Sequence, residues 1–245
     1  MVLLTATITP GVPGVMVQDP ATRRSQYRLA LDRWLRYGSR HDVDVVFVEN
    51  SDEDLDALAS GLPKGRARGL TLLSAPRPTI PVLARGKGAA EAEMIDYAVQ
   101  ALEGLQDSLL IKCTGRLFVS NLMRSVAGVD RSSSAMLLRR TLDWSYADTR
   151  CIAASGTVWA SHLSGMSVDV CEPDGEYLEH ALARRATLAH ASGTVTVRPF
   201  SARPRLVGSS ATTGHRYDSA LGDAQRLAAL PLERLLRGPL RRKQY

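Results

Sequence analysis

Short apolar runs recur along the first half of the chain, and each ends in a cluster of turn-forming residues. Runs of β-branched and apolar residues bounded in this way are typical of buried strands. Four of them predict strands, over residues 2–9, 43–48, 69–74 and 109–113. Between these runs, apolar side chains recur at helical spacing, which predicts helices over residues 24–37, 52–60 and 89–105.

The second half of the chain has a more mixed pattern. Strands are predicted over residues 134–138, 151–160 and 194–199, and a helix over 177–189. Strands that alternate with helices form βαβ units, and such units build a largely parallel sheet. The sequence therefore predicts one Rossmann-like α/β domain over residues 1–217, with a mostly parallel central sheet.

A basic, leucine-rich tail follows this domain over residues 218–245. Between Arg226 and Tyr245, six basic residues stand against one acidic residue. As a helix interrupted at Pro231, the tail would be amphipathic, apolar on one side and basic on the other. That composition suits the surface of an anionic membrane, at about 1 kcal/mol per basic residue. The alternative is a helix that packs back on the domain, and the membrane surface is the favoured prediction.

The composition restricts the class of protein. With 44% hydrophobic and 23% charged residues, the chain of 245 residues is globular rather than disordered. Its three cysteines, Cys113, Cys151 and Cys171, lack zinc-ligand spacing and are interpreted as small apolar residues in a reducing compartment. No stretch reads as a signal peptide or a membrane span. We therefore expect a cytoplasmic protein that is peripheral to the inner face of the plasma membrane through its tail.

The common catalytic and nucleotide-binding motifs are absent from the sequence. It contains no GxGxxG after the first strand, no P-loop, no GxSxG and no HExxH. Aromatic residues make up 5% of the chain and do not interleave with a basic patch, so no nucleic-acid partner is expected. Two alternatives to the function developed below are a non-catalytic nucleic-acid-binding domain and another nucleotide-dependent transferase, such as a methyltransferase.

Polar side chains gather at the ends of the predicted strands, where parallel α/β sheets bind their ligands. Thr7 ends the first strand, and Glu49 and Asn50 end the second. A carboxylate in this position accepts hydrogen bonds from the two neighbouring hydroxyls of a ribose. These three residues are therefore the candidate nucleoside-binding residues. The alternative for Glu49 is that it only caps the helix that follows.

Cations mark a second group of candidates. Lys87 lies in a Gly-Lys-Gly turn at a predicted helix N-terminus, where free backbone amides attract anions. Lys112 and Arg116 interrupt the fourth apolar run, and the arginine offers a planar, two-pronged donor. These three cations, with His215 from the C-terminal side, are candidates for binding a diphosphate. For Lys87 and His215 the alternative is a solvated loop residue.

Several stretches, taken together, resemble a known family. In order they read LLTATITPG, RRSQYRLALDRWL, VVFVENS, GKGAAEAEMIDYAV, LLIKCTGRLFVSN, ADTRC, YLEHALA and PRLVGSSATTGHRY. They resemble bacterial glycosyltransferases of surface-polysaccharide (capsule and lipopolysaccharide) clusters, which have a GT-A-like fold and carry a K-x-TGR-x4-N element. The resemblance spans residues 2–217. In this chain the element consists of Lys112, Thr114, Gly115, Arg116 and Asn121.

The resemblance implies both an activity and its substrates. A nucleotide-sugar donor would lie across the strand ends of the N-terminal half, and the C-terminal half would bind a saccharide or lipid-linked acceptor. The implied reaction is transfer of a hexosyl or pentosyl group in the biosynthesis of cell-surface polysaccharide or glycoconjugates.

The chain departs from ordinary GT-A enzymes at the DxD motif that holds Mg²⁺ or Mn²⁺ against the diphosphate. The sequence DVD at 42–44 precedes a strand, so it belongs to the wrong edge of the sheet. Either Asp148 holds a metal ion with water and phosphate oxygens, or Lys112 and Arg116 take the place of the metal. The second alternative is favoured, in which case no cofactor is required.

An inverting transfer also needs a carboxylate that takes the proton of the acceptor hydroxyl. Glu179 follows a loop and begins a predicted helix, which makes it the first candidate, and Asp148 is the second. Asp169 and Glu176 are further candidates. The alternative for Glu179 is structural, because acidic residues are favoured in the first turn of any helix by its macrodipole.

Overall fold

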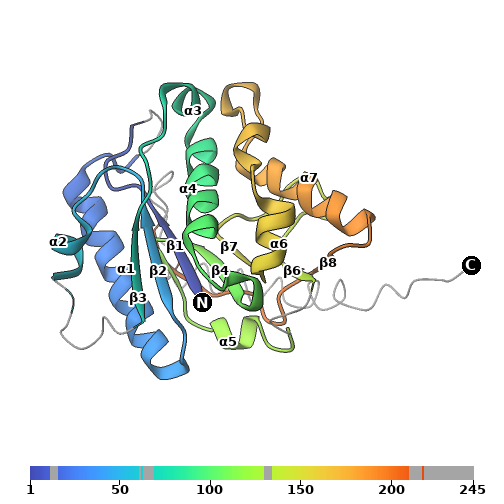
Figure 1. The fold of residues 1–245 in the computed structure, drawn as a ribbon, viewed down its shortest axis with the longest axis horizontal. Helices are drawn as coiled ribbons and strands as arrows, with labels where there is room; N and C mark the ends of the chain where they lie inside the picture. Colours follow the sequence, from blue (N-terminus) through green and yellow to red (C-terminus); the bar gives the residue numbers. More distant parts are fainter. Residues whose placement is uncertain (12–15, 61, 63–68, 130–133, 210–216, 218–245) are drawn as a thin grey trace, which may run out of the picture.

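The computed structural model describes residues 1–11, 16–60, 62, 69–129, 134–209 and 217. The predicted tail over 218–245 and the candidate His215 lie outside these residues. The described part is an α/β fold on a seven-stranded, mostly parallel sheet, which confirms the predicted fold class (Figure 1). None of the described helices combines the length and the apolar character that crossing a bilayer requires.

The strands of the described part fall into two sheets. Their bounds are β1 (Val2–Ala6), β2 (Val45–Glu49), β3 (Leu70–Ser74), β4 (Leu109–Thr114), β5 (Leu117–Val119), β6 (Ala135–Leu137), β7 (Cys151–Ser155), β8 (Thr196–Arg198) and β9 (Leu206–Gly208). The central sheet has the order β3-β2-β1-β4-β7-β6-β8, and β5 pairs with β9 in the second sheet. In the central sheet β7 runs against its neighbours, and the other strands share one direction.

The helices connect these strands and cover both faces of the sheet. Their bounds are α1 (Pro20–His41), α2 (Leu55–Ser60), α3 (Ile80–Arg85), α4 (Lys87–Ala101), α5 (Leu122–Ser125), α6 (Gly156–Val158) and α7 (Leu178–Ala191). Short turns of other helical types are η1 (Leu105–Asp107), η2 (Trp159–Leu163), η3 (Met166–Asp169) and η4 (Glu172–Asp174).

Each face of the sheet has its own hydrophobic core, because successive strand residues point to opposite faces. Leu3 and Leu110 pack in the core that contains the buried residues of α4 and α7, which lie on the same side of the sheet (Figure 1). Leu4 and Ile111 pack in the core that contains those of α1. The free cysteines of β4 and β7 are also buried in this second core, as expected of small apolar residues.

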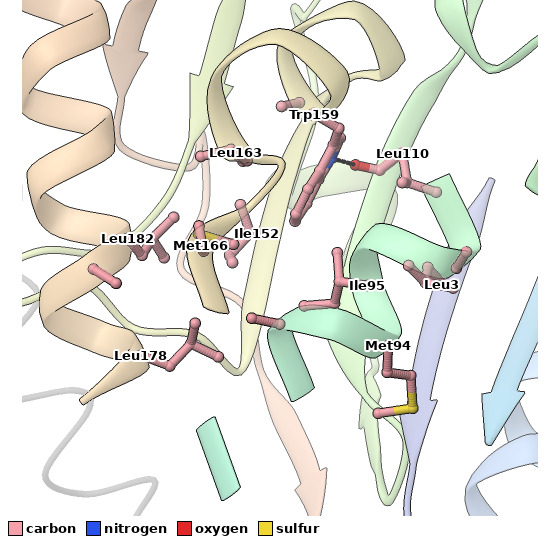
Figure 2. Close-up of a cluster of buried hydrophobic side chains, with 14 of the residues drawn as sticks. Leu3, Met94, Ile95, Leu110, Ile152, Trp159, Leu163, Met166, Leu178 and Leu182 are labelled. Carbon is pink, nitrogen blue, oxygen red and sulfur yellow. Dashed lines mark hydrogen bonds between the residues drawn. The ribbon is translucent and has the colours of Figure 1, made fainter. Parts of the chain in front are cut away.

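Trp159 occupies the centre of the first core. Figure 2 shows its ring between Leu163 and Ile95, with the indole nitrogen directed at β4. Nε1 donates a hydrogen bond to the backbone oxygen of Leu110 at 3.2 Å. The ring is 1% exposed, so this donor would have no access to water without the carbonyl. Trp159 therefore joins η2 to the sheet through both packing and a directed bond.

Several element boundaries differ from the sequence predictions, and two of them have clear local reasons. The helix predicted over 24–37 begins earlier, because the Asp19 carboxylate caps it by accepting from the Thr22 backbone N–H at 2.8 Å and Pro20 fits its first turn. The strand predicted over 151–160 ends at Ser155, because the Ser155 hydroxyl accepts from the Val158 N–H at 3.4 Å and starts a helix. The sequence did not predict α3, α5, α6, β5 or β9.

Replacing Trp159 separates its two contributions to stability. Trp159→Ala is expected to lower the free energy of unfolding by about 3–5 kcal/mol, since it leaves a large cavity. Trp159→Phe keeps most of the ring and loses the hydrogen bond, so the expected loss is about 1–2 kcal/mol. Urea denaturation followed by circular dichroism measures the free energy of unfolding of both variants. Equal losses in the two variants would show that the hydrogen bond contributes more than the packing of the ring.

Candidate functional site

A cavity of about 880 Å³ opens at the carboxyl edge of the parallel strands. Its lining includes the ends of β1 and β4, which lie side by side where the order of the strands reverses. Because β7 is antiparallel, the segment that leads into it, residues 147–150, lies at the same edge. Open α/β sheets bind ligands at such a reversal. The cavity therefore lies where the sequence predicts the site.

Cations outnumber carboxylates in the lining of this cavity. The cations are Arg23, Arg77, Lys87, Arg116, Arg139, Arg140 and Arg150, and the carboxylates are Glu91, Asp148, Glu172 and Glu179. An excess of fixed positive charge in a cleft raises the local concentration of anions. The ligand of this cavity is therefore expected to be negatively charged.

Gly115 lets the turn after β4 approach β1 closely. Its backbone N–H donates to the Thr5 carbonyl at 2.9 Å. A Cβ on Gly115 would lie 2.6 Å from that carbonyl oxygen and 3.2 Å from Cδ1 of Tyr27, so no other residue fits without displacing β1. The glycine of the sequence element is thus explained by packing, and it places its neighbours Thr114 and Arg116 in the cavity lining.

Arg116 is directed over the ring of Tyr27, with its guanidinium carbon 5.6 Å from the ring centre. Its Nε and Nη1 atoms are buried, and neither has a hydrogen-bond partner among the described residues. Buried donors of a charged group without partners are rare and costly, because they lose their hydration. Because Arg116 also lines the cavity, its guanidinium is a candidate partner for an anion there.

Lys112 takes a different position from the one the sequence suggests. It shares the side of β4 with Leu110, which faces α4, and it is 0% exposed. Its Nζ forms an ion pair with Glu91 Oε1 at 2.7 Å and donates to the Thr149 carbonyl at 2.6 Å. Lys112 is not part of the cavity lining. This placement does not support the prediction that Lys112 binds a diphosphate. Instead, Lys112 holds Glu91 and the backbone at Thr149 in position beneath the cavity.

Glu91, which sequence reasoning missed, is the centre of a polar network between the cavity, where its side chain is 27% exposed, and the fully buried Lys112. Its Oε1 accepts from Lys112 and also from the Thr5 hydroxyl at 2.8 Å. Burial alone would raise the pKa of Glu91, but Lys112 and Thr5 outweigh burial and hold that pKa below its ordinary value. The carboxylate is therefore charged and fixed. Its only signal in the sequence is an acidic residue among the alanines in the first half of α4.

Glu179 lies in the first turn of α7 and lines the cavity, as expected of a catalytic candidate. Its Oε1 accepts from the Thr149 hydroxyl at 2.8 Å. Its backbone carbonyl accepts from the Ala147 N–H at 3.1 Å, which joins α7 to the segment before β7. Burial, with the nearby charges of Glu179 and Asp148, raises the pKa of Tyr146 to about 12, so a protonated phenol stands beside this carboxylate.

Asp148 also lines the cavity, but two arginines already occupy its oxygens. Arg150 binds it through Nε at 2.8 Å and Nη2 at 2.6 Å, and Arg139 Nη1 binds Oδ2 at 3.1 Å. Burial opposes ionisation here, yet the bonds and charges of these arginines hold the pKa of Asp148 below its ordinary value. A carboxylate in this state suits neither a proton acceptor nor a metal ligand.

The residues of the cavity do not fit the divalent metal that ordinary GT-A enzymes hold. Asp148, the candidate ligand, is neutralised by Arg139 and Arg150. Within the described residues, no group of three or more His, Cys, Asp and Glu side chains is placed to hold a metal ion. The expectation that Asp148 binds Mg²⁺ or Mn²⁺ therefore finds no support in the arrangement of its neighbours.

Lys87 lines the cavity at the N-terminus of α4, as expected, but this terminus is already occupied. Glu172 Oε1 accepts from the Gly88 backbone N–H at 2.8 Å. Gly86 has a φ of 110°, and a Cβ there would lie 2.5 Å from the Glu172 carboxyl carbon. The glycines around Lys87 thus make room for an internal carboxylate rather than for a phosphate.

The candidate nucleoside-binding residues divide into two groups. Thr7 and Asn50 line the cavity, and the Thr7 hydroxyl donates to Asn50 Oδ1 at 2.7 Å. Glu49 is 1% exposed, lies outside the lining, and accepts from the backbone N–H of Ile8 at 3.0 Å and of Ser51 at 2.8 Å. For Glu49 the structural alternative is supported, since its carboxylate ties the loops after β1 and β2 together.

The last residue of the sequence element, Asn121, lies away from the cavity lining. Its side chain donates to the Arg203 carbonyl at 3.0 Å and accepts from the Arg205 N–H at 2.7 Å. Asn121 therefore fastens the strand β5 to the segment before β9. It belongs to the support of the turn that carries Arg116, not to the binding surface.

Sequence reasoning also missed the support of Arg116 from α1. Arg23 and Tyr27 are one helical turn apart, so they share a face of α1, and both line the cavity. Arg23 Nε donates to the Thr7 carbonyl at 2.8 Å, and Tyr27 accepts from the Thr7 N–H at 3.1 Å. Burial lowers the pKa of Arg23, and the neighbouring charge of Arg116 adds to this effect. The pair fixes the end of β1 and the platform under Arg116.

Comparison with known proteins gives matches among solved structures but not among protein families or curated proteins. No protein-family model matches the chain, and no curated protein matches it. A structure of the galactosyltransferase LgtC in complex with donor and acceptor sugar analogues has a TM-score of 0.48 and 10% identity, over 80% of this chain and 72% of LgtC. An active-site mutant of LgtC gives a TM-score of 0.42 with the same identity and coverage.

HddC from Yersinia pseudotuberculosis is similar with a TM-score of 0.33 and 14% identity, over 66% of this chain and 80% of HddC. At these identities and TM-scores, the similarities carry no conclusion about activity. The function has to be inferred from the residues of this chain.

Lys112→Met tests the buried ion pair through the pH dependence of stability. In the native chain the pKa of Glu91 is depressed, so the pair stabilises the fold above the ordinary carboxyl pKa and loses this effect as the pH falls. Without Lys112, burial dominates and raises that pKa. The expected loss is about 3–5 kcal/mol near neutral pH, and it shrinks as the pH falls and Glu91 takes up a proton.

Urea denaturation across the acidic and neutral range measures this difference between the variant and the native chain. Arg36→Met is the matched control, because Arg36 pairs with Asp32 on the surface of α1 at 2.8 Å. It is expected to change stability little at any pH. A loss in Lys112→Met that does not depend on pH would contradict the assignment of the ion pair.

Proposed function

We propose that this chain is a glycosyltransferase that moves a sugar from a nucleotide-sugar donor to a saccharide or lipid-linked acceptor. The observation that carries the proposal is that Arg116 lines a cationic cavity at the strand reversal, and two of its buried guanidinium nitrogens have no hydrogen-bond partner among the described residues. A diphosphate is the anion that matches this position, since parallel α/β sheets bind nucleotides at such reversals. The volume of about 880 Å³ accommodates a nucleotide sugar.

The donor would lie along the ends of β1, β2 and β4. Thr7 and Asn50 line the part of the cavity at the ends of β1 and β2, and they offer a hydroxyl and an amide to a nucleoside. Arg116 follows β4 and meets the diphosphate. In this arrangement the sugar would lie on the side of β7, near Thr149 and Glu179.

The chain's own residues supply two kinds of catalysis. As the bond between sugar and diphosphate breaks, negative charge grows on the departing oxygen, and a preorganised guanidinium stabilises it without reorganising. Glu179 takes the proton of the acceptor hydroxyl if the transfer inverts the anomeric centre. Asp148 is held by two arginines and does not serve as this base.

The neutralisation of the diphosphate is assigned to Arg116, with Lys87 as a further cation in the same cavity. No step is assigned to a divalent metal, because Asp148 does not fit one. The pathway is proposed to be cell-surface polysaccharide or glycoconjugate biosynthesis. The basic tail predicted over 218–245 would then hold the enzyme at the inner, cytoplasmic face of the plasma membrane.

Screening nucleotide sugars for release of nucleoside diphosphate, with EDTA and without, tests the proposal. At least one donor is expected to be turned over, and turnover is expected to persist in EDTA because a guanidinium neutralises the diphosphate. Arg116→Ala is expected to lower kcat/KM by about 100-fold or more, with a melting temperature close to that of the native chain. Arg124→Ala is the control, since Arg124 is exposed on α5.

Two results would contradict the proposal. The first is the absence of turnover with every donor, together with stabilisation by S-adenosylmethionine or a salt-sensitive gel shift with an oligonucleotide. The second is a collapse of the fold in Arg116→Ala, which would assign Arg116 to structure rather than to ligand binding.

Glu179→Gln tests the proposed base. The substitution keeps the size of the side chain and its place beside Thr149, but it removes the ability to accept a proton. We expect kcat to fall by about 100- to 10,000-fold, while the KM for the donor stays close to the native value. Glu176→Gln is a suitable comparison because Glu176 pairs with Arg184 at 2.5 Å outside the cavity lining. Equal losses in the two variants would argue against Glu179 as the base.

A further inference from the structure

Arg140 is held in a three-layer stack at the rim of the cavity. It lines the cavity just after β6, and its guanidinium carbon lies 3.4 Å from the centre of the Trp144 ring. Trp144 in turn stacks on His190 of α7, with ring centres 5.4 Å apart and planes inclined by 14°. A guanidinium stacked on an aromatic ring keeps its edge, and so its N–H donors, available for a ligand.

The turn that carries Trp144 is built in an unusual conformation. Trp144 has a φ of 61°, which bulky residues rarely adopt. The turn is closed by hydrogen bonds from the Thr141 N–H to the Tyr146 carbonyl at 2.9 Å and from the Trp144 N–H to the Thr141 carbonyl at 3.2 Å. Asp143 adds a bond from the Ser145 N–H at 3.1 Å. Strained residues that the surroundings hold in place are concentrated at ligand-binding sites.

Arg140 differs from the two arginines beside it in its partners. Arg139 and Arg150 both bind Asp148. Arg140 Nη1 donates to the Thr141 carbonyl at 3.1 Å, and no carboxylate of the described residues is paired with it. Arg140 is exposed at the rim of the cavity, so a ligand can reach it from solvent. The stack fixes the plane of a cation whose counter-ion the described part of the protein does not provide.

The sheet order separates Arg140 from Arg116. Arg116 follows β4, Thr149 precedes β7, and Arg140 follows β6, and these three strands are consecutive neighbours in the sheet. Neighbouring strands are about 4.8 Å apart, so β4 and β6 are separated by about 10 Å at this edge. Glu179, bound to Thr149, belongs to the middle position. An anion at Arg140 would therefore lie on the other side of Glu179 from the diphosphate.

We propose that Arg140 binds a phosphate group of the acceptor, either a sugar phosphate or the phosphate headgroup of a lipid. This inference rests on the proposed function, because it takes Arg116 as the donor side of Glu179. A guanidinium edge binds phosphate through two parallel hydrogen bonds. Phosphate is favoured over a carboxylate because it carries up to two negative charges, and the wall formed by residues 139–150 holds three arginines against one aspartate in the cavity lining.

Calorimetric titration tests this site without turnover. Inorganic pyrophosphate at saturation first occupies the donor side, and then glucose 1-phosphate, dodecyl phosphate and glucuronate are titrated separately. Glucose 1-phosphate represents a free sugar phosphate, dodecyl phosphate a lipid phosphate, and glucuronate a carboxylate. We expect one or both phosphates to bind at least about tenfold more tightly than glucuronate. The tighter of the two phosphates identifies the source.

Variants assign the binding to the stack. Arg140→Ala is expected to lower the affinity for the phosphate probe about tenfold or more. Arg140→Lys is expected to keep only part of the native affinity, since a lysine has no planar edge. Trp144→Leu is expected to weaken it as well, because it removes the platform but keeps Arg140. Arg116→Ala should weaken pyrophosphate while leaving the affinity for the phosphate probe within about twofold. Arg124→Ala on α5 is the control.

Three results would overturn the proposal: neither phosphate binds the native chain, Arg140→Ala binds them as tightly as the native chain does, or glucuronate binds equally well. If Arg116→Ala removes pyrophosphate and the phosphate probes together, there is a single anion site and the proposal is also wrong. Failure of the proposed function is distinguishable. It shows as no turnover in the donor screen, whereas phosphate binding at Arg140 is judged by these titrations alone.

Discussion

The buried ion pair between Glu91 and Lys112 fixes the floor of the cavity. Glu91 belongs to α4 and Lys112 to β4, and Lys112 also binds the carbonyl of Thr149 just before β7. One ammonium group therefore joins a covering helix to two neighbouring strands at the edge where the site lies. Compared with apolar residues, such a pair adds little net stability, because desolvation offsets attraction. Its contribution is positional, since the Thr149 hydroxyl is then held 2.8 Å from Glu179.

The direction of β7 decides which residues reach the site. In a wholly parallel sheet, the segment before a strand lies at the edge opposite to the ligand. Because β7 runs against β4, Asp148, Thr149 and Arg150 lie beside the carboxyl end of β4. β6 runs parallel to β4, so its end, with Arg140 after it, lies at the same edge as Arg116. One antiparallel strand thus assembles a wall that the parallel half of the sheet could not supply.

The sequence predicts the parallel strands and the edge at which polar residues gather, because periodicity and strand ends are local properties. It also places Arg116 and Glu179 in the site. It does not predict the ion pair of Lys112, because its partner Glu91 belongs to α4 and meets Lys112 only when α4 packs on β4. For Glu49 the sequence leaves a ribose ligand and a structural role open, and the loop amides that favour the structural role converge only in three dimensions. Strand ends predict where charges gather, and packing decides which of them stay free.

The state of each charge in the cavity argues for group transfer rather than simple binding. The oxygens of Asp148 accept hydrogen bonds from arginines, and one oxygen of Glu179 accepts a hydrogen bond from the Thr149 hydroxyl. Within the described residues, Arg23, Arg116 and Arg140 line the cavity without an ion pair to a carboxylate. The nitrogens of Arg23 donate to the carbonyls of Thr7 and Val17 and to the Tyr27 hydroxyl, whereas Arg116 and Arg140 each keep nitrogens for which no such bond is found among these residues. They stand at strands on either side of Glu179. A protein that only bound one anion would need one such cation. Two of them, separated by a carboxylate at a middle strand, suit two anionic substrates that meet at a proton acceptor, which is the geometry a transferase requires.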